Sequence, residues 1–131
     1  MKNRYGFGRT VALPFDTAVA RVTAALAAEG FGILTEIDVQ ATLKKKIDKD
    51  FTKYVILGAC NPGFAFQALS GEIDIGLLLP CNVTVYENPA DGKTVVSVLD
   101  PETMVTLTGR KDIDPLARQV REKVVAALEA I

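Results

Sequence analysis

The chain has 131 residues, of which 49% are hydrophobic and 24% are charged, and this composition is ordinary for one globular domain. Its 15 basic and 16 acidic residues give a net charge of −1, which offers no electrostatic case for a nucleic-acid partner. The sequence has no histidine, so the commonest general base and the commonest metal ligand are both absent.

The apolar runs of the chain are too short to cross a lipid bilayer, so we expect no membrane partner. The charged amino-terminal stretch is not followed by the apolar segment of a signal peptide. We therefore expect a cytoplasmic protein. In that compartment the two cysteines, Cys60 and Cys81, are expected to be thiols rather than a disulfide.

The first strand and the first helix are predicted from the spacing of apolar residues, which changes along the sequence. Alternating apolar residues, interrupted by Arg9, predict a strand within residues 2–13. Apolar residues at helical spacing then predict a helix at about 16–29, with Asp16 as its N-cap and Gly30 just beyond its end.

A second strand and a short helix follow. Residues 31–39 alternate, with Ile33 and Ile37 expected on one face and Glu36 on the other. The period then lengthens to four, which predicts a helix at about 39–48. The lysines at 44–46 are expected on its solvated side, because nearby aspartates dilute their charge and weaken the alternative of an anion site.

The second half of the chain repeats one helix-start signal. A continuous apolar run at 54–60 predicts a central strand covered on both faces. An Asn or Asp followed by proline occurs three times, and proline is well tolerated at the first helical position. These pairs predict helices beginning at residues 62, 101 and 115, the second of them short and ending near Met104. Strands are expected at 81–87 and 95–99, joined by a hairpin loop.

This order of elements predicts the fold class. Strands ending in a hairpin and followed by a long helix favour an antiparallel or mixed sheet with helices on one face. We therefore predict a single α+β domain of two layers, spanning residues 1–131.

Candidate chemistry centres on two Cys-Asn pairs, Cys60-Asn61 and Cys81-Asn82. Cys60 precedes an expected helix N-terminus, which favours a reactive thiolate, although cysteine also packs as a small buried hydrophobe. Asn61 is explained as a helix cap, whereas Asn82 has no such role. If the strands at 54–60 and 81–87 are antiparallel neighbours, both sulfurs lie at one end of the sheet.

Three uses of these thiols are open: a redox pair, a thiolate metal site, or inert packing. A closed zinc site needs four ligands, so Glu36 or a second subunit would have to complete it. Glu36 and Asp38 share one strand face and could do acid–base work, or could be a solvent-facing edge and a helix cap.

The segments Tyr54–Pro62 and Ile75–Val83, each containing a Cys-Asn pair, resemble the domain of unknown function family 302. Residues 31–39 and Asp100-Pro101 add to the resemblance, which covers nearly the whole chain. It implies a TATA-binding-protein-like fold, with a curved, mostly antiparallel sheet and helices on one side. It also implies a homodimer, but it supplies neither an activity nor a cofactor.

Three functions are compatible with these features. The first, which we favour, is a homodimeric module that binds a small ligand or a metal, with Cys60, Asn61, Cys81, Asn82 and Glu36 as candidate ligand-binding residues. The second is a thiol-dependent enzyme or redox protein that uses Cys60. The third is a structural or regulatory dimer with inert thiols. Whether the protein is an enzyme, and which cofactor it takes, do not follow from the sequence.

Overall fold

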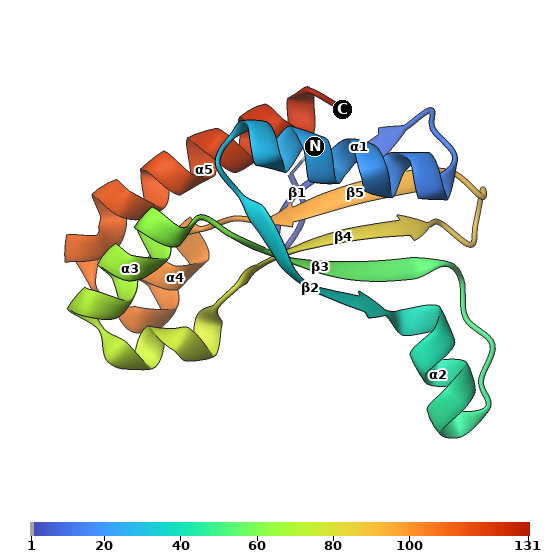
Figure 1. The fold of residues 1–131 in the computed structure, drawn as a ribbon, viewed down its shortest axis with the longest axis horizontal. Coiled ribbons are helices and arrows are strands. Elements are labelled where there is room, and N and C mark those ends of the chain that lie inside the picture. Colours follow the sequence, from blue (N-terminus) through green and yellow to red (C-terminus); the bar gives the residue numbers. More distant parts are fainter. Residues whose placement is uncertain (1) are drawn as a thin grey trace.

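The computed structural model describes residues 2–131 and shows a five-stranded antiparallel sheet with helices (Figure 1). The elements in chain order are β1 (Gly6–Val11), α1 (Phe15–Ala28), β2 (Gly32–Asp38), α2 (Val39–Ile47), β3 (Tyr54–Cys60), α3 (Pro62–Gly71), the 3₁₀ helix η1 (Ile73–Leu78), β4 (Cys81–Glu87), β5 (Thr94–Leu99), α4 (Glu102–Thr108), the 3₁₀ helix η2 (Lys111–Ile113) and α5 (Asp114–Glu129).

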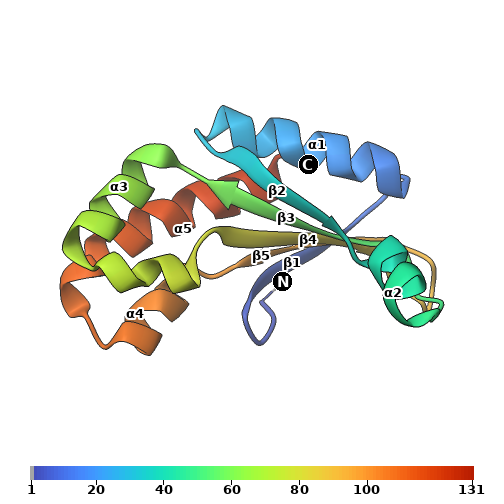
Figure 2. The same cartoon turned by 60° about the horizontal axis from the view of Figure 1, so that its bottom comes forward.

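The sheet has the strand order β1-β5-β4-β3-β2, and every neighbouring pair is antiparallel. Helices α1 and α5 lie side by side over one face of this sheet, and the N-terminal segment lies toward the other face (Figure 2). The prediction of a two-layer α+β fold is confirmed. None of the helices in residues 2–131 has both the length and the apolar character needed to cross a bilayer.

The main core lies between the sheet and these two helices. Alternate residues of the central strands point toward the helices and are almost completely buried, as a strand with one covered face requires. They meet apolar stripes on α1 and α5 that repeat every three to four residues. The largest fully buried side chains of this core are Val22, Leu26, Leu57, Val83, Val85, Val96 and Val124.

The remaining helices lie beyond the two ends of the strands (Figures 1 and 2). Helix α2 lies at one end, after β2. We call the elements at the opposite end, residues 62–78 and 101–113, the end lobe; it contains α3, η1, α4 and η2. The end lobe has a hydrophobic cluster of its own, with Ala68, Ile75, Met104 and Ile113 buried at its centre. The structure therefore has two cores, and the one in the end lobe is the smaller.

Most predicted elements are confirmed within a residue or two, namely α1, α2, β3, α3, β4, β5 and α5. Helix α4 runs to Thr108, beyond the predicted end, and the 3₁₀ helix η1 was not predicted. The structure confirms Asn61 and Asp38 as N-caps, because each side chain accepts a hydrogen bond from a backbone N–H of the following helix. Asp16 is not a cap: it lies inside the first turn of α1, where its charge still favours the helix dipole.

Two features of the edge strands correct the predicted pattern. Arg9 interrupts the apolar alternation of β1 because its guanidinium donates hydrogen bonds to the carbonyls of Leu128 and Glu129, 3.1 and 3.0 Å away. It thereby satisfies the C-terminal end of α5. In β2 a bulge shifts the register between residues 33 and 35, so Ile33 and Ile37 lie on opposite faces rather than on the same face.

Candidate functional site

The register of the two central strands brings the cysteines to one end of the sheet. Strands β3 and β4 are antiparallel neighbours, and Ala59 pairs with Cys81. Cys60 is the next residue and the last one of β3. Both thiols are free and partly buried. The expectation that the end of one strand meets the start of the other is confirmed.

A cavity of about 60 Å³ lies where this end of the sheet meets the end lobe. Its walls come from β3, β4, the turn after α1, and helices on both sides of the end lobe. The lining residues are Phe31, Ala59, Cys60, Asn61, Phe64, Ala65, Ala68, Ile75, Leu79, Pro80, Cys81, Pro101, Met104, Ile113, Leu116, Ala117 and Val120. The cavity thus lies between the main core and the core of the end lobe.

Polar groups are scarce in the cavity wall. Apart from the two thiols, Asn61 carries the only polar side chain among the lining residues. Its carboxamide oxygen accepts a hydrogen bond from the backbone N–H of Phe64 at 3.3 Å, which holds the first turn of α3. No charged side chain of residues 2–131 belongs to the lining. The site is therefore an apolar chamber with two thiols.

Tight packing fixes the strand beside the cysteines. A Cβ atom on Gly58 would collide with Oγ1 of Thr35 and would lie 2.7 Å from Cγ of Pro80. Only glycine leaves room for both side chains at this point of β3. Pro80, which precedes Cys81 and lines the cavity, is thereby seated against the sheet.

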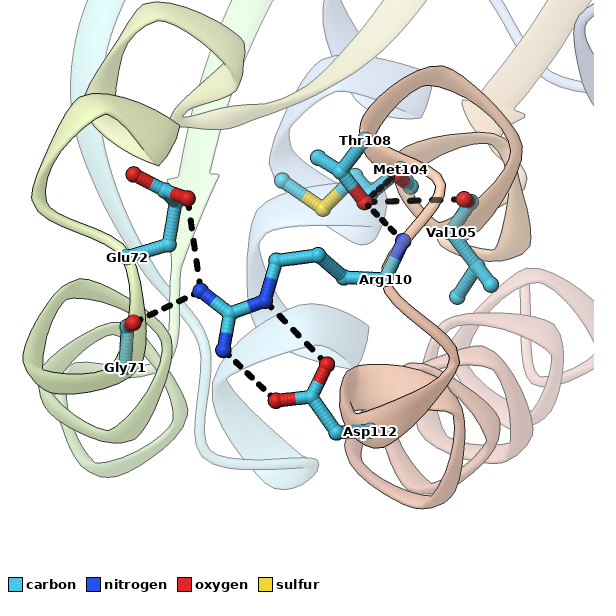
Figure 3. A network of polar contacts seen from close by, with 7 residues as sticks. All are labelled: Gly71, Glu72, Met104, Val105, Thr108, Arg110 and Asp112. Atoms are coloured by element: carbon cyan, nitrogen blue, oxygen red, sulfur yellow. Dashed lines mark hydrogen bonds and ion pairs between the residues drawn. The ribbon is translucent and has the colours of Figure 1, made fainter.

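Arg110 joins the two sides of the end lobe (Figure 3). One terminal nitrogen donates to the carbonyl of Gly71 at 2.6 Å and to a carboxylate oxygen of Glu72 at 3.3 Å. The other terminal nitrogen and Nε donate to the two oxygens of Asp112, at 2.6 and 3.1 Å. The hydrogen bonds from Arg110 lower the pKa of the Asp112 carboxyl. The end of α3 is thus tied to the segment that follows α4.

The environment of the cavity changes the acidity of one thiol. Burial, and then the charge of the neighbouring Cys60, raise the pKa of the Cys81 thiol from 9.0 to about 11. Cys81 is therefore held as a neutral thiol at physiological pH.

Two of the predicted site residues lie elsewhere. Asn82 is exposed and does not line the cavity, because successive residues of a strand point to opposite faces; its side chain lies in a groove with Tyr54 and Tyr86 on the face away from α1 and α5. Glu36 is exposed on the edge strand β2, where it pairs with Leu57, and it too is absent from the cavity wall. The structure brings together Cys60, Asn61 and Cys81, but neither Asn82 nor Glu36.

The donor atoms present limit which metals the site could hold. Within residues 2–131 no group of three or more His, Cys, Asp or Glu side chains is placed to hold a metal ion. The carboxylate that a four-ligand zinc site would need is absent from the wall, because Glu36 lies away from it. The third sulfur in the wall is the thioether of Met104, which was not among the predicted site residues.

The apolar lining was the part of the site that sequence reasoning missed. Phe31, Phe64, Ile113 and Leu116 come from four separate segments, and each fits the pattern of an ordinary core residue. The only usable signal was the position of the Asn-Pro and Asp-Pro pairs, which start helices close to the end of the sheet. Side-chain alternation along 81–85 would have placed Asn82 on the opposite face from Cys81.

Comparison with known proteins identifies a family and similar solved structures. A family model described as "Domain of unknown function DUF302" matches residues 7–131. A crystal structure of an uncharacterized conserved DUF302 protein from Bacillus stearothermophilus superposes with a TM-score of 0.89 at 26% sequence identity, covering 98% of both chains. A search of functionally curated proteins found no match.

We predict that Cys81 makes the stability of the protein fall at alkaline pH. The native state keeps the Cys81 proton up to a pKa of about 11, whereas the unfolded thiol loses it near 9.0. The contribution of the protonated Cys81 thiol to the free energy of unfolding is therefore complete below pH 9 and is lost between pH 9 and 11. It amounts to about 2–3 kcal/mol. Urea unfolding from pH 7 to 11 should show a smaller alkaline loss for Cys81→Ala than for the wild type.

Cys60→Ala is the matched control for this prediction. This substitution removes the charge of Cys60, which is the smaller of the two causes that raise the pKa of Cys81, and leaves Cys81 buried. Most of the fall in stability between pH 9 and 11 should therefore remain. Identical pH profiles for the wild type and Cys81→Ala would show that Cys81 is not held as a neutral thiol.

Proposed function

The chain belongs to the family described as "Domain of unknown function DUF302", and we propose that it is a binding protein that takes a small apolar or soft ligand, or a metal, into the cavity beside Cys60 and Cys81. The observation that carries this proposal is the cavity itself. It is lined almost entirely by apolar groups, yet both cysteines of the chain belong to its wall.

The size of the cavity limits the ligand. A site for one water molecule needs about 10–15 Å³, and an apolar cavity of about 150 Å³ in another protein stays dry and binds benzene. At about 60 Å³ this cavity lies between those values, so its occupant has only a few heavy atoms. Because Asn61 is already engaged in capping α3, little in the wall favours water.

The arrangement of the wall supports binding over plain packing. A close-packed protein interior leaves few voids larger than one water molecule. Here the void lies where two separately packed cores meet, and the hydrogen bonds from Arg110 to Gly71 and Glu72 tie the two sides of the end lobe together. A boundary between two cores can leave a cavity that the side chains of a single continuous core would fill.

Xenon binding in solution tests the cavity. Methyl NMR under xenon pressure should show saturable shifts at Ile75, Met104 and Ile113, which line the cavity, and none at Val85 in the main core. Ala68→Leu places three more carbon atoms into the cavity, so it should abolish these shifts.

Ala126→Leu is the matched control, because Ala126 is an exposed helical residue. It should leave xenon binding unchanged. Shifts that do not saturate, or that survive in Ala68→Leu, would refute the proposed binding function and favour inert thiols.

We propose further that the protein is a homodimer joined through β2. This strand is at an edge of the sheet and pairs only with β3, so it presents unpaired backbone groups. Two of its large apolar side chains are well exposed, Leu34 at 67% and Ile37 at 47%. Pairing of two β2 strands would satisfy the backbone groups and cover these side chains together.

The expected mass by light scattering at micromolar concentration is about twice 14.1 kDa. Leu34→Lys should give the monomer mass, because a charge at the centre of the interface is costly to bury. Leu77→Lys, at a residue that is 88% exposed in the end lobe, should leave the dimer intact. A monomeric wild type, or a dimer broken equally by both substitutions, would disprove this interface.

A further inference from the structure

We propose that the ligand of the cavity is a monovalent soft metal ion, Cu(I), held by the sulfur atoms of Cys60, Cys81 and Met104. This inference rests on the proposed binding function of the same cavity and names the chemistry of its ligand. It depends on the residue types in the wall and on where the fold places them.

The first observation is the concentration of sulfur. The chain has two cysteines and two methionines, and three of these four residues line this one cavity. They come from three different elements: the end of β3, the start of β4, and α4. Only the fold brings them together, since Met104 is far from both cysteines in the sequence.

The second observation is what the wall lacks. Thiolate and thioether ligands select soft ions such as Cu(I), whereas carboxylate, carbonyl and water ligands suit Mg²⁺, Ca²⁺ and Mn²⁺. No carboxylate belongs to the lining residues, and the chain has no histidine. Structural zinc sites and iron–sulfur clusters take four protein ligands, one more than this wall supplies. Cu(I) accepts two or three sulfur ligands, and the wall supplies three.

The third observation concerns charge and solvent. Binding would transfer the two thiol protons to the solvent, leaving two thiolates and one Cu(I) with a net charge of −1. The N-terminus of α3, which begins at Pro62 just after Cys60, carries the positive end of a ten-residue helix next to this charge. The copper keeps its oxidation state, so the step needs neither an oxidant nor a reductant.

The test is an anaerobic titration of the full chain with Cu(I), in competition with a chromophoric Cu(I) chelator. The wild type should bind one Cu(I) per chain. Met104→Leu is nearly isosteric, so it should keep the fold and the xenon-binding cavity while weakening Cu(I) binding about tenfold, or about 1.4 kcal/mol. The double variant Cys60→Ser, Cys81→Ser should lose the site.

X-ray absorption at the copper edge of the wild-type complex provides a readout that needs no variant. It should show three sulfur neighbours for copper. Nitrogen or oxygen donors around the metal, or Cu(I) binding that survives loss of both thiols, would overturn the assignment.

The two proposals fail in different ways. The wild type could bind xenon in the cavity and yet take no more Cu(I) from the chelator than the double cysteine variant does. That result would overturn the copper assignment and leave the proposed binding function in place. A wild type that binds neither would refute both proposals. Ala126→Leu again serves as the control and should match the wild type in both measurements.

Discussion

The antiparallel pairing of β3 with β4 is the contact on which the candidate site depends. These strands lie at the centre of the sheet, and pairing of Ala59 with Cys81 fixes which residues meet at its end. A shift of one residue would turn the whole apolar set of a strand toward the wrong face, so the buried valines and leucine of these strands hold the register firmly. The positions of the two cysteines are thus a consequence of the main core.

The end lobe packs over this end of the strands and forms the rest of the cavity wall. Asn61 follows the last residue of β3 and caps α3, so the chain passes directly from the sheet into the end lobe. Helix α4 and the start of α5 return from the other side and bring Met104 and Leu116 to the wall. Arg110 then links the two sides through Gly71 and Glu72, and Asp112 in its own segment holds its guanidinium in place (Figure 3). The cavity wall is therefore formed by one end of the sheet, the end lobe and the start of α5.

Sequence patterns predicted the parts of the structure that depend on local chemistry. The continuous apolar run of β3 and the Asn-Pro start of α3 are strong signals, and their predicted positions are confirmed. Cavity lining was not predictable in the same way, because Phe31, Met104 and Ile113 differ from core residues only in what lies opposite them. Glu36 illustrates the same limit: its place on the sheet depends on the pairing of β2, which no local pattern specifies.

Asn82 and Arg9 show two further sources of error. The repeated Cys-Asn motif suggested that both asparagines share one site, but Asn61 follows the end of a strand whereas Asn82 lies within one, and alternation sends it to the other face. Arg9 broke the apolar pattern because it caps the end of a helix that is distant in sequence. The position of Asn82 therefore follows from local strand alternation, whereas the role of Arg9 depends on a tertiary contact.

The central claim is that the fold places the two thiols in one apolar chamber and makes them unequal. The most direct measurement is the rate of alkylation of each cysteine by iodoacetamide in the native wild-type protein at pH 7, resolved by peptide mass spectrometry. A pKa of about 11 gives Cys81 about a hundredfold less thiolate than an ordinary thiol, partly offset by greater nucleophilicity. The account predicts that Cys81 reacts about tenfold more slowly than an ordinary thiol, and more slowly than Cys60. Equal rates for the two cysteines, both matching those of the unfolded chain, would contradict it.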